Sequence, residues 1–228
     1  DYGIPGSPEG HISGVDIEME KITQKFEYHR DIKFLSDFKT FDLEQRFVKY
    51  EHQEYESKKT FAAVDLGQQI FSLHGKLKGA NRSIGALMQY RKFTAGGFYW
   101  TPDTDEINFA VFGFREKEFK LVTLQASSRL ELLTVKPESS PSSTNIDLEQ
   151  VKERNFYYGS YALGFFKDWQ NWKMSSNIML LQRAPGIEDM FSDGPHLGSY
   201  SYEIIVPDGT IKKPIEELIQ KNINKLFE

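Results

Sequence analysis

Short segments in which apolar and polar residues alternate place the strongest constraint on the fold of this chain. In residues 15–19, Val, Ile and Met alternate with acidic residues, which is the period of a strand with one solvated face. The same period returns in residues 71–77 and 84–90, on either side of a short Gly- and Asn-containing segment at 79–81. Two alternating runs joined by so short a turn predict a β-hairpin.

The phase of the alternation changes within the first of these segments. Apolar residues fall at odd positions up to Met19 and at even positions from Ile22 to Tyr28. A straight strand cannot place both sets on one face, so we expect a β-bulge near Glu20 and Lys21 that restores the alignment.

Further strands follow along the chain. Residues 31–59 fit both a helical and a strand period, and the strand is favoured. In the segment 107–114 both faces are apolar, as expected for a strand that is covered on both sides. Other predicted strands span residues 98–101, 119–126, 129–136, 156–166, 177–182 and 200–206. The pattern predicts a mainly β fold (β-rich α+β) of about nine or ten mostly antiparallel strands, arranged as a barrel or sandwich.

The organisation predicted for the chain is a single β-rich domain over residues 15–228. Residues 1–14 are rich in Gly and Pro and indicate an extended arm, and the Ser- and Pro-rich segment 137–145 indicates a mobile loop. Residues 213–228 predict an amphipathic C-terminal helix packed on the sheet, with Pro214 in its first turn and lysines near its end.

Composition narrows the range of partners. The formal net charge is -5, and neither a recognition helix nor a zinc-finger pattern occurs, so we expect no nucleic-acid partner. The apolar runs are only a few residues long, far short of the ~20 that a helix needs to cross a bilayer, so we expect no membrane span.

A secreted or extracellular location is the expectation for this protein, although the absence of cysteine leaves the compartment open. The first residue, Asp1, is consistent either with a mature product after removal of a leader or with an arbitrary boundary. The triplet beginning at Asn81 is an N-glycosylation acceptor in a predicted turn, where a secreted glycoprotein could carry a glycan.

No catalytic, metal-binding or nucleotide-binding motif occurs, so the cofactor is unknown and no metal site is expected. The five histidines are scattered singly. Enzymatic activity stays open, although the missing motifs favour a non-enzymatic protein. The enzymatic alternative is a carboxylate-dependent hydrolase that uses Glu131, Asp168 or Glu203.

The aromatic content is the most informative feature for function. The chain holds 18 Phe, 11 Tyr and 3 Trp. Our leading hypothesis is a carrier or storage-type protein that holds an apolar small molecule in an aromatic-lined β-barrel. The side chains expected around the ligand are Trp100, Phe109, Phe112, Tyr158 and Phe166, with Arg91 or Lys92 at its polar end.

A second hypothesis is an interaction module that binds glycan or protein. Trp169 and Trp172 stand among polar residues, and this predicts an exposed aromatic surface. The N-terminal arm could also be ordered by a neighbouring subunit in a homo- or hetero-oligomer, with disorder as the equal alternative.

Overall fold

The computed structural model describes residues 2–4, 15–55, 62–97, 101–138, 151–169, 171–191, 194–196, 201–206 and 209–214. Within these ranges the chain forms strands and one short helix. The strands are β1 (Tyr2–Ile4), β2 (Val15–Asp31), β3 (Thr40–Tyr55), β4 (Ala62–Lys78), β5 (Arg82–Gly97), β6 (Thr104–Glu118), β7 (Thr123–Pro137), β8 (Arg154–Asp168), β9 (Lys173–Leu181), β10 (Gly194–His196), β11 (Ser201–Val206) and β12 (Gly209–Pro214), and the helix is α1 (Ile187–Phe191).

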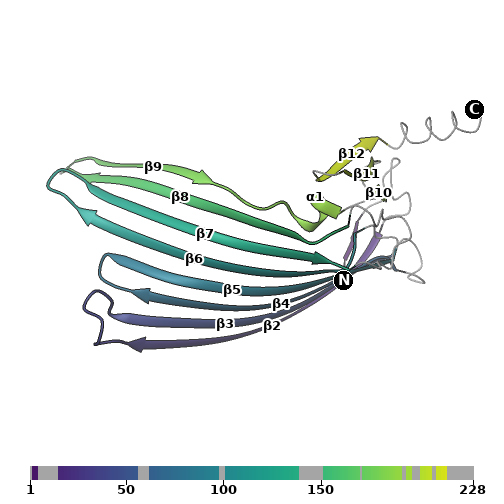
Figure 1. Ribbon diagram of the computed structural model, residues 1–228, viewed down its shortest axis with the longest axis horizontal. Helices are drawn as coiled ribbons and strands as arrows, with labels where there is room; N and C mark the ends of the chain where they lie inside the picture. The colour runs from purple at the N-terminus through teal and green to yellow at the C-terminus, as the bar shows by residue number, and fades with distance from the viewer. Residues whose placement is uncertain are drawn as a thin grey trace, which may run out of the picture.

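One nine-stranded antiparallel sheet dominates the fold (Figure 1). Its spatial order β1 to β9 is the order of the sequence, so each strand pairs with its sequence neighbours. A second sheet of three short strands follows in the order β10-β11-β12. The mainly β, antiparallel prediction is therefore confirmed.

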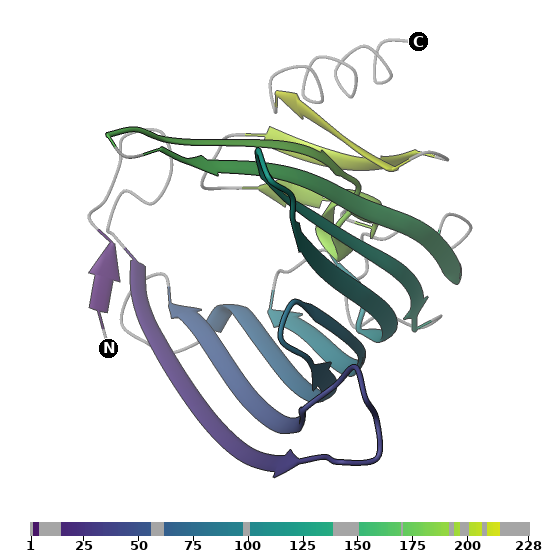
Figure 2. The same cartoon turned by 90° about the vertical axis from the view of Figure 1, so that its left-hand side faces the viewer.

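The large sheet is not closed. β9 forms one edge, and at the other edge β1 pairs only with residues 15–17 of β2. Among the described residues, the rest of the outer edge of β2 has no partner strand. Figure 2 shows the sheet bent into a deep curve, with these two edges on either side of an opening.

The pairing registers assign every strand residue to one face of the sheet, because directly paired residues point to the same side and consecutive residues to opposite sides. We call the concave side the inner face; it carries odd residues of β2, β5, β7 and β9 and even residues of β3, β4, β6 and β8. The convex side is the outer face and carries the complementary set.

A small hydrophobic core lies on the inner face, at the end of the sheet that receives α1 (Figures 1 and 2). Met190 and Phe191 of α1 are fully buried there beside Val135 of β7. The backbone N–H of Gly186 donates a hydrogen bond of 3.0 Å to Oδ2 of Asp189, which caps the first turn of this short helix.

The structure corrects two details of the sequence prediction. β2 and β3 pair without a register shift, so the bulge expected near Glu20 and Lys21 is wrong. The change of phase has another cause: Val15 and Ile17 are buried on the inner face, whereas Ile22 and its even-numbered successors lie on the outer face. The strands predicted at 119–126 and 129–136 are one continuous strand, β7, preceded by a turn.

The hairpin predicted over residues 71–90 is confirmed as β4 and β5, and residues 40–55 form a strand rather than a helix. Within the predicted arm, residues 2–4 form β1. Lys213 and Pro214 end β12, and the remaining residues of the predicted C-terminal helix lie outside the described residues. Most of the predicted loop at 137–145 also lies outside them.

Candidate functional site: an apolar outer face and a polar inner face

The outer face of the sheet is covered with exposed apolar side chains. Among the residues that the structure describes, nineteen large hydrophobic residues on this face are exposed, against five on the strands of the inner face. The nineteen are Ile22, Phe26, Tyr28, Phe71, Leu73, Ile84, Met88, Tyr90, Ile107, Phe109, Val111, Leu130, Tyr157, Tyr161, Leu163, Phe165, Met174, Ile178 and Leu180. These residues lie on seven strands, β2 and β4 to β9, and an apolar surface of this width exceeds the few hundred Å² that monomeric water-soluble proteins typically expose.

These side chains, with the less exposed apolar residues between them, form a continuous band. On each strand the band extends over about seven to nine residues, for example Ile84–Tyr90 on β5 and Leu124–Leu132 on β7. At ~3.3 Å per residue this corresponds to about 20–26 Å along the strand.

The band runs obliquely across the hydrogen-bonded rows. The band covers residues 22–28 on β2 and residues 174–180 on β9. Relative to the rows of directly paired residues, its centre shifts by about eight residues toward the β8–β9 turn over the seven steps from β2 to β9. With strands ~4.8 Å apart, a level belt shifts by about one residue per strand when the strands tilt by about 35–40°. On strands tilted by about 35–40°, the band therefore lies at one constant height across the sheet.

Aromatic side chains lie at both borders of the band. Phe47, Tyr90 and Tyr157 lie at the border near α1, and Phe41 and Phe165 lie at the border near the turns that join β2 to β3 and β8 to β9. Figure 1 shows these turns, and those of the two hairpins between them, at one end of the sheet.

Charged residues continue the outer face beyond each border. The described strand residues beyond the turn-side border include five bases and no acid, and we call this set the basic flank: Arg30, Arg82, Arg115, Lys117 and Lys167. The opposite flank holds six acids and three lysines: Asp16, Glu18, Glu20, Lys49, Glu51, Asp65, Lys92, Asp105 and Lys136. Glu51 accepts a hydrogen bond of 2.6 Å from Lys49, which raises the pKa of this lysine.

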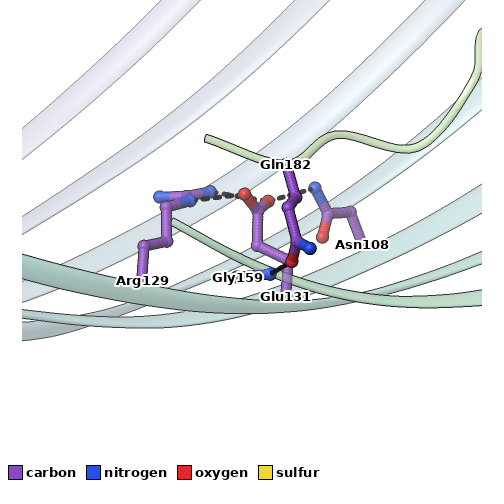
Figure 3. A network of polar contacts seen from close by, with 5 residues as sticks. All are labelled: Asn108, Arg129, Glu131, Gly159 and Gln182. Carbon is purple, nitrogen blue, oxygen red and sulfur yellow. Dashed lines mark hydrogen bonds and ion pairs between the residues drawn. The ribbon is translucent and has the colours of Figure 1, made fainter. Parts of the chain in front are cut away.

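The inner face is polar over the same height, and a network of charged and amide groups lies near its middle (Figure 3). Arg129 donates to both carboxylate oxygens of Glu131, at 2.7 and 2.9 Å, and the amide of Asn108 donates to Glu131 at 3.1 Å. Beside this group, the backbone N–H of Gly159 donates to Oε1 of Gln182 at 3.2 Å. The side chain of Glu131 is only 13% exposed, so its charge depends on these partners.

Other ionic groups of the inner face are also paired. Arg91 of β5 contacts Glu106 of β6. His29 and Lys78 both contact Asp42 of β3, each at 2.5 Å. The inner face thus carries many charges that are largely balanced, whereas the described strand residues of the outer face between the flanks carry none.

The structure divides the residues predicted to bind a ligand between the two faces. Arg91, Phe112, Tyr158 and Phe166 lie on the inner face. Phe109 and Lys92 lie on the outer face, and Trp100 lies outside the described residues. A ligand on either face therefore contacts only part of the predicted set.

Trp169 and Trp172 lie in the turn between β8 and β9 and exchange two backbone hydrogen bonds, at 2.7 and 3.3 Å. Their exposed fractions are 49% and 77%, as an interaction surface requires. Asn81 is exposed in the turn between β4 and β5, and whether it carries a glycan stays a prediction.

Two features were not predicted from the sequence. The Arg129–Glu131 pair could have been, because opposite charges two residues apart on a strand lie on the same face. The basic flank could not, since its five residues come from four strands and only the pairing registers bring them together.

The carboxylates considered for hydrolysis are dispersed. Glu131 belongs to the central network, Asp168 pairs with Lys173 at 3.3 Å near the β8–β9 turn, and Glu203 lies on β11 of the second sheet. Among the described residues, no three His, Asp or Glu side chains gather in a way that could hold a metal ion.

No helix in the described part of the chain is long and apolar enough to cross a membrane.

Comparison with protein-family models and with curated protein sequences finds no match to this chain.

Proposed function

We propose that the nine-stranded sheet forms part of the wall of a transmembrane β-barrel, in which the outer face contacts lipid acyl chains and the inner face lines a polar lumen. The function that follows is the passage or reception of polar solutes across a membrane. The observation that carries this proposal is the exposed apolar band of the convex face, backed on the same strands by a charged concave face.

The direction of curvature argues against a water-soluble barrel. In such a barrel the apolar side chains fill the concave interior and the convex surface is polar. Here the apolar band is on the convex side, and the concave side carries the Arg129–Glu131 and Arg91–Glu106 pairs. An apolar exterior around a polar interior is the arrangement of membrane-spanning barrels.

The geometry of the band favours lipid over a second protein layer as its cover. A packed sheet or a second copy of the chain has no requirement for a level belt of constant height. A bilayer does require one, and it also selects aromatic residues at the borders and charges beyond them. The strand tilt of about 35–40° that makes this band level lies in the range of known barrels.

The extent of the band is close to that of a hydrocarbon layer. Along the strands it measures about 20–26 Å, which is a height of about 16–21 Å for strands tilted by about 35–40°, a few Å less than the roughly 25 Å of the outward apolar band of outer-membrane barrels. The proposal requires the free edges at β2 and β9 to pair, either with each other or through further strands, because unpaired backbone groups are costly in lipid.

Site-specific labelling tests the proposal. Because the chain has no cysteine of its own, a label reacts at the introduced cysteine without competition from native thiols. Single cysteines replace, one at a time, the consecutive residues Leu87, Met88, Gln89 and Tyr90 of β5, and each variant is folded into phosphatidylcholine vesicles and labelled with a polarity-sensitive fluorophore. We expect a lipid-attached quencher to act on positions 88 and 90, and aqueous iodide to act on positions 87 and 89.

Two other patterns contradict the proposal. If iodide quenches all four positions equally, the outer face is in water. If positions 88 and 90 are protected from both quenchers, protein rather than lipid covers the band.

A further inference from the structure

We infer that the outer face carries a binding site for an anionic phospholipid, in which Arg82 and Arg115 hold the headgroup phosphate and a groove below them receives an acyl chain. This inference rests on the proposed function. It assigns a ligand class to one part of the outer face and orients the sheet in the bilayer.

Arg82 on β5 and Arg115 on β6 are direct cross-strand partners, and both lie on the outer face. Like charges placed directly opposite each other destabilise a sheet. Lys117 follows two residues later on the same face, which adds a third positive charge. A bound anion removes this repulsion, and a phosphate matches the donor geometry of paired guanidinium groups.

One neighbouring acid pairs with this group and neutralises only part of its positive charge. Asp37, in the turn between β2 and β3, contacts one terminal nitrogen of Arg82 at 2.8 Å and leaves the other terminal nitrogen as a donor. Among the described residues, no carboxylate lies within ion-pair distance of Arg115 or Lys117. Lys117 instead lies over the ring of Phe119, with its ammonium 5.0 Å from the ring centroid.

An apolar groove of about 550 Å³ begins one step below the arginine pair. In the hydrogen-bonded rows, Ile84 and Gly113 follow Arg82 and Arg115 on the same face. Small residues open the groove where Gly75, Ala86 and Gly113 approach the surface, and Phe41, Leu77 and Leu130 are among the side chains along it.

The combination selects one kind of ligand. A free phosphate satisfies the arginines and leaves the groove empty, and a neutral lipid fills the groove and leaves the arginines repelling each other. A phospholipid with a net negative headgroup satisfies both. Because the opposite flank is rich in acids, the basic flank faces the leaflet in which such lipids are enriched.

Native mass spectrometry of the full chain, released from nanodiscs of phosphatidylcholine with about one-third phosphatidylglycerol, measures the lipid retained. The unmodified chain is expected to retain phosphatidylglycerol in preference to phosphatidylcholine. In Arg82→Gln/Arg115→Gln the preference should fall about tenfold to thirtyfold, since each basic residue near an anionic surface contributes about one kcal/mol. The matched control, Lys92→Gln/Lys136→Gln, removes the same charge from the opposite flank and should leave the preference unchanged.

A second variant tests the groove. A Cβ at Gly113 meets only ordinary contacts, 3.9 Å from Ile84 and from the carbonyl oxygen of Ser83, and this glycine lines the groove, so Gly113→Leu places an apolar side chain in the groove. It should weaken retention of phosphatidylglycerol while both arginines remain. Equal retention by the arginine and lysine variants, or unchanged retention by Gly113→Leu, overturns the inference.

The quenching pattern of β5 in pure phosphatidylcholine separates this inference from the proposed function. If positions 88 and 90 face lipid and the anionic preference is absent, the lipid site is wrong and the membrane-spanning wall stands. If the alternation of quenching is itself absent, both fail.

Discussion

Leu130 and Glu131 are consecutive residues of β7 that face opposite sides of the sheet. Leu130 is half exposed in the apolar band, and Glu131 accepts hydrogen bonds from Arg129 and Asn108 on the inner face. A single step along the backbone thus passes from an apolar surface to a charged one. This alternation repeats on strand after strand, so neighbouring residues of a strand face two different environments. The same kind of substitution should therefore have opposite effects on stability at neighbouring positions.

The change Leu130→Arg tests the proposed contact of the outer face with lipid. A charge near the middle of the apolar band should lower the free energy of unfolding from vesicles by about 2–4 kcal/mol. The control Thr134→Arg lies on the same strand and face, past the border of the band, and should cost at most about 1 kcal/mol. Urea titration of both variants in vesicles makes the comparison, and equal losses would contradict a membrane-embedded band.

The change Arg129→Leu tests the inner face. It leaves the nearly buried carboxylate of Glu131 with the Asn108 amide and the Tyr158 hydroxyl as its hydrogen-bond donors and without a positive partner, so we expect a loss of about 1–3 kcal/mol in the free energy of unfolding. Adding Glu131→Gln should recover part of this loss, because the unpaired charge is then gone.

The matched control for this pair is Lys173→Leu, which breaks an ion pair with Asp168 that is largely exposed. Exposed pairs contribute about 1 kcal/mol or less. Two results would contradict a role for burial in the contribution of the central network to stability. One is an equal loss of unfolding free energy in Lys173→Leu and Arg129→Leu, and the other is no recovery of that loss when Glu131→Gln is added to Arg129→Leu.

The strands could be predicted from sequence because their alternation is local. Residues 71–77 and 84–90 carry the period of a hairpin, and the structure pairs them as β4 and β5. The change of phase before Ile22 was also visible, but its cause was not. A bulge and a change of the apolar face from inside to outside leave the same pattern in one strand, and only the register with β3 separates them.

The expectation of no membrane span was based on uninterrupted apolar runs, and the outer face contributes none. In β7, Leu130 and Leu132 are separated by Glu131, so no run forms although the outer face is continuous. Likewise, Arg82 and Arg115 are far apart in the sequence and meet only through the β5–β6 register. Spacing within a strand defines its faces, but the assembled surface depends on how neighbouring strands pair.

Gly85 should be sensitive to the smallest added side chain. It lies opposite Phe112 on the inner face, and a Cβ there would meet the Phe112 ring and, at 2.5 Å, the carbonyl oxygen of Gly75. Gly85→Ala should therefore destabilise the fold by about 1–3 kcal/mol. Gly113→Ala, on the neighbouring strand where a Cβ meets only ordinary contacts, should be nearly neutral. Thermal unfolding distinguishes the two, and equal effects would contradict the packing of Phe112 over Gly85.

The anchoring of α1 gives the last prediction. Phe191 is fully buried against the inner face, in the same cluster as Val135 and Phe93, and the guanidinium of Arg154 lies 5.4 Å from its ring centroid. Phe191→Ala should cost about 3–5 kcal/mol and release α1, so that the backbone amides of residues 187–191 exchange faster with deuterium. The control Phe34→Ala removes an equal ring that is 82% exposed in the β2–β3 turn and should leave this exchange unchanged. Hydrogen–deuterium exchange followed by mass analysis measures both. Protection that persists in Phe191→Ala would mean that the polar connections of α1, rather than its aromatic anchor, hold it against the sheet.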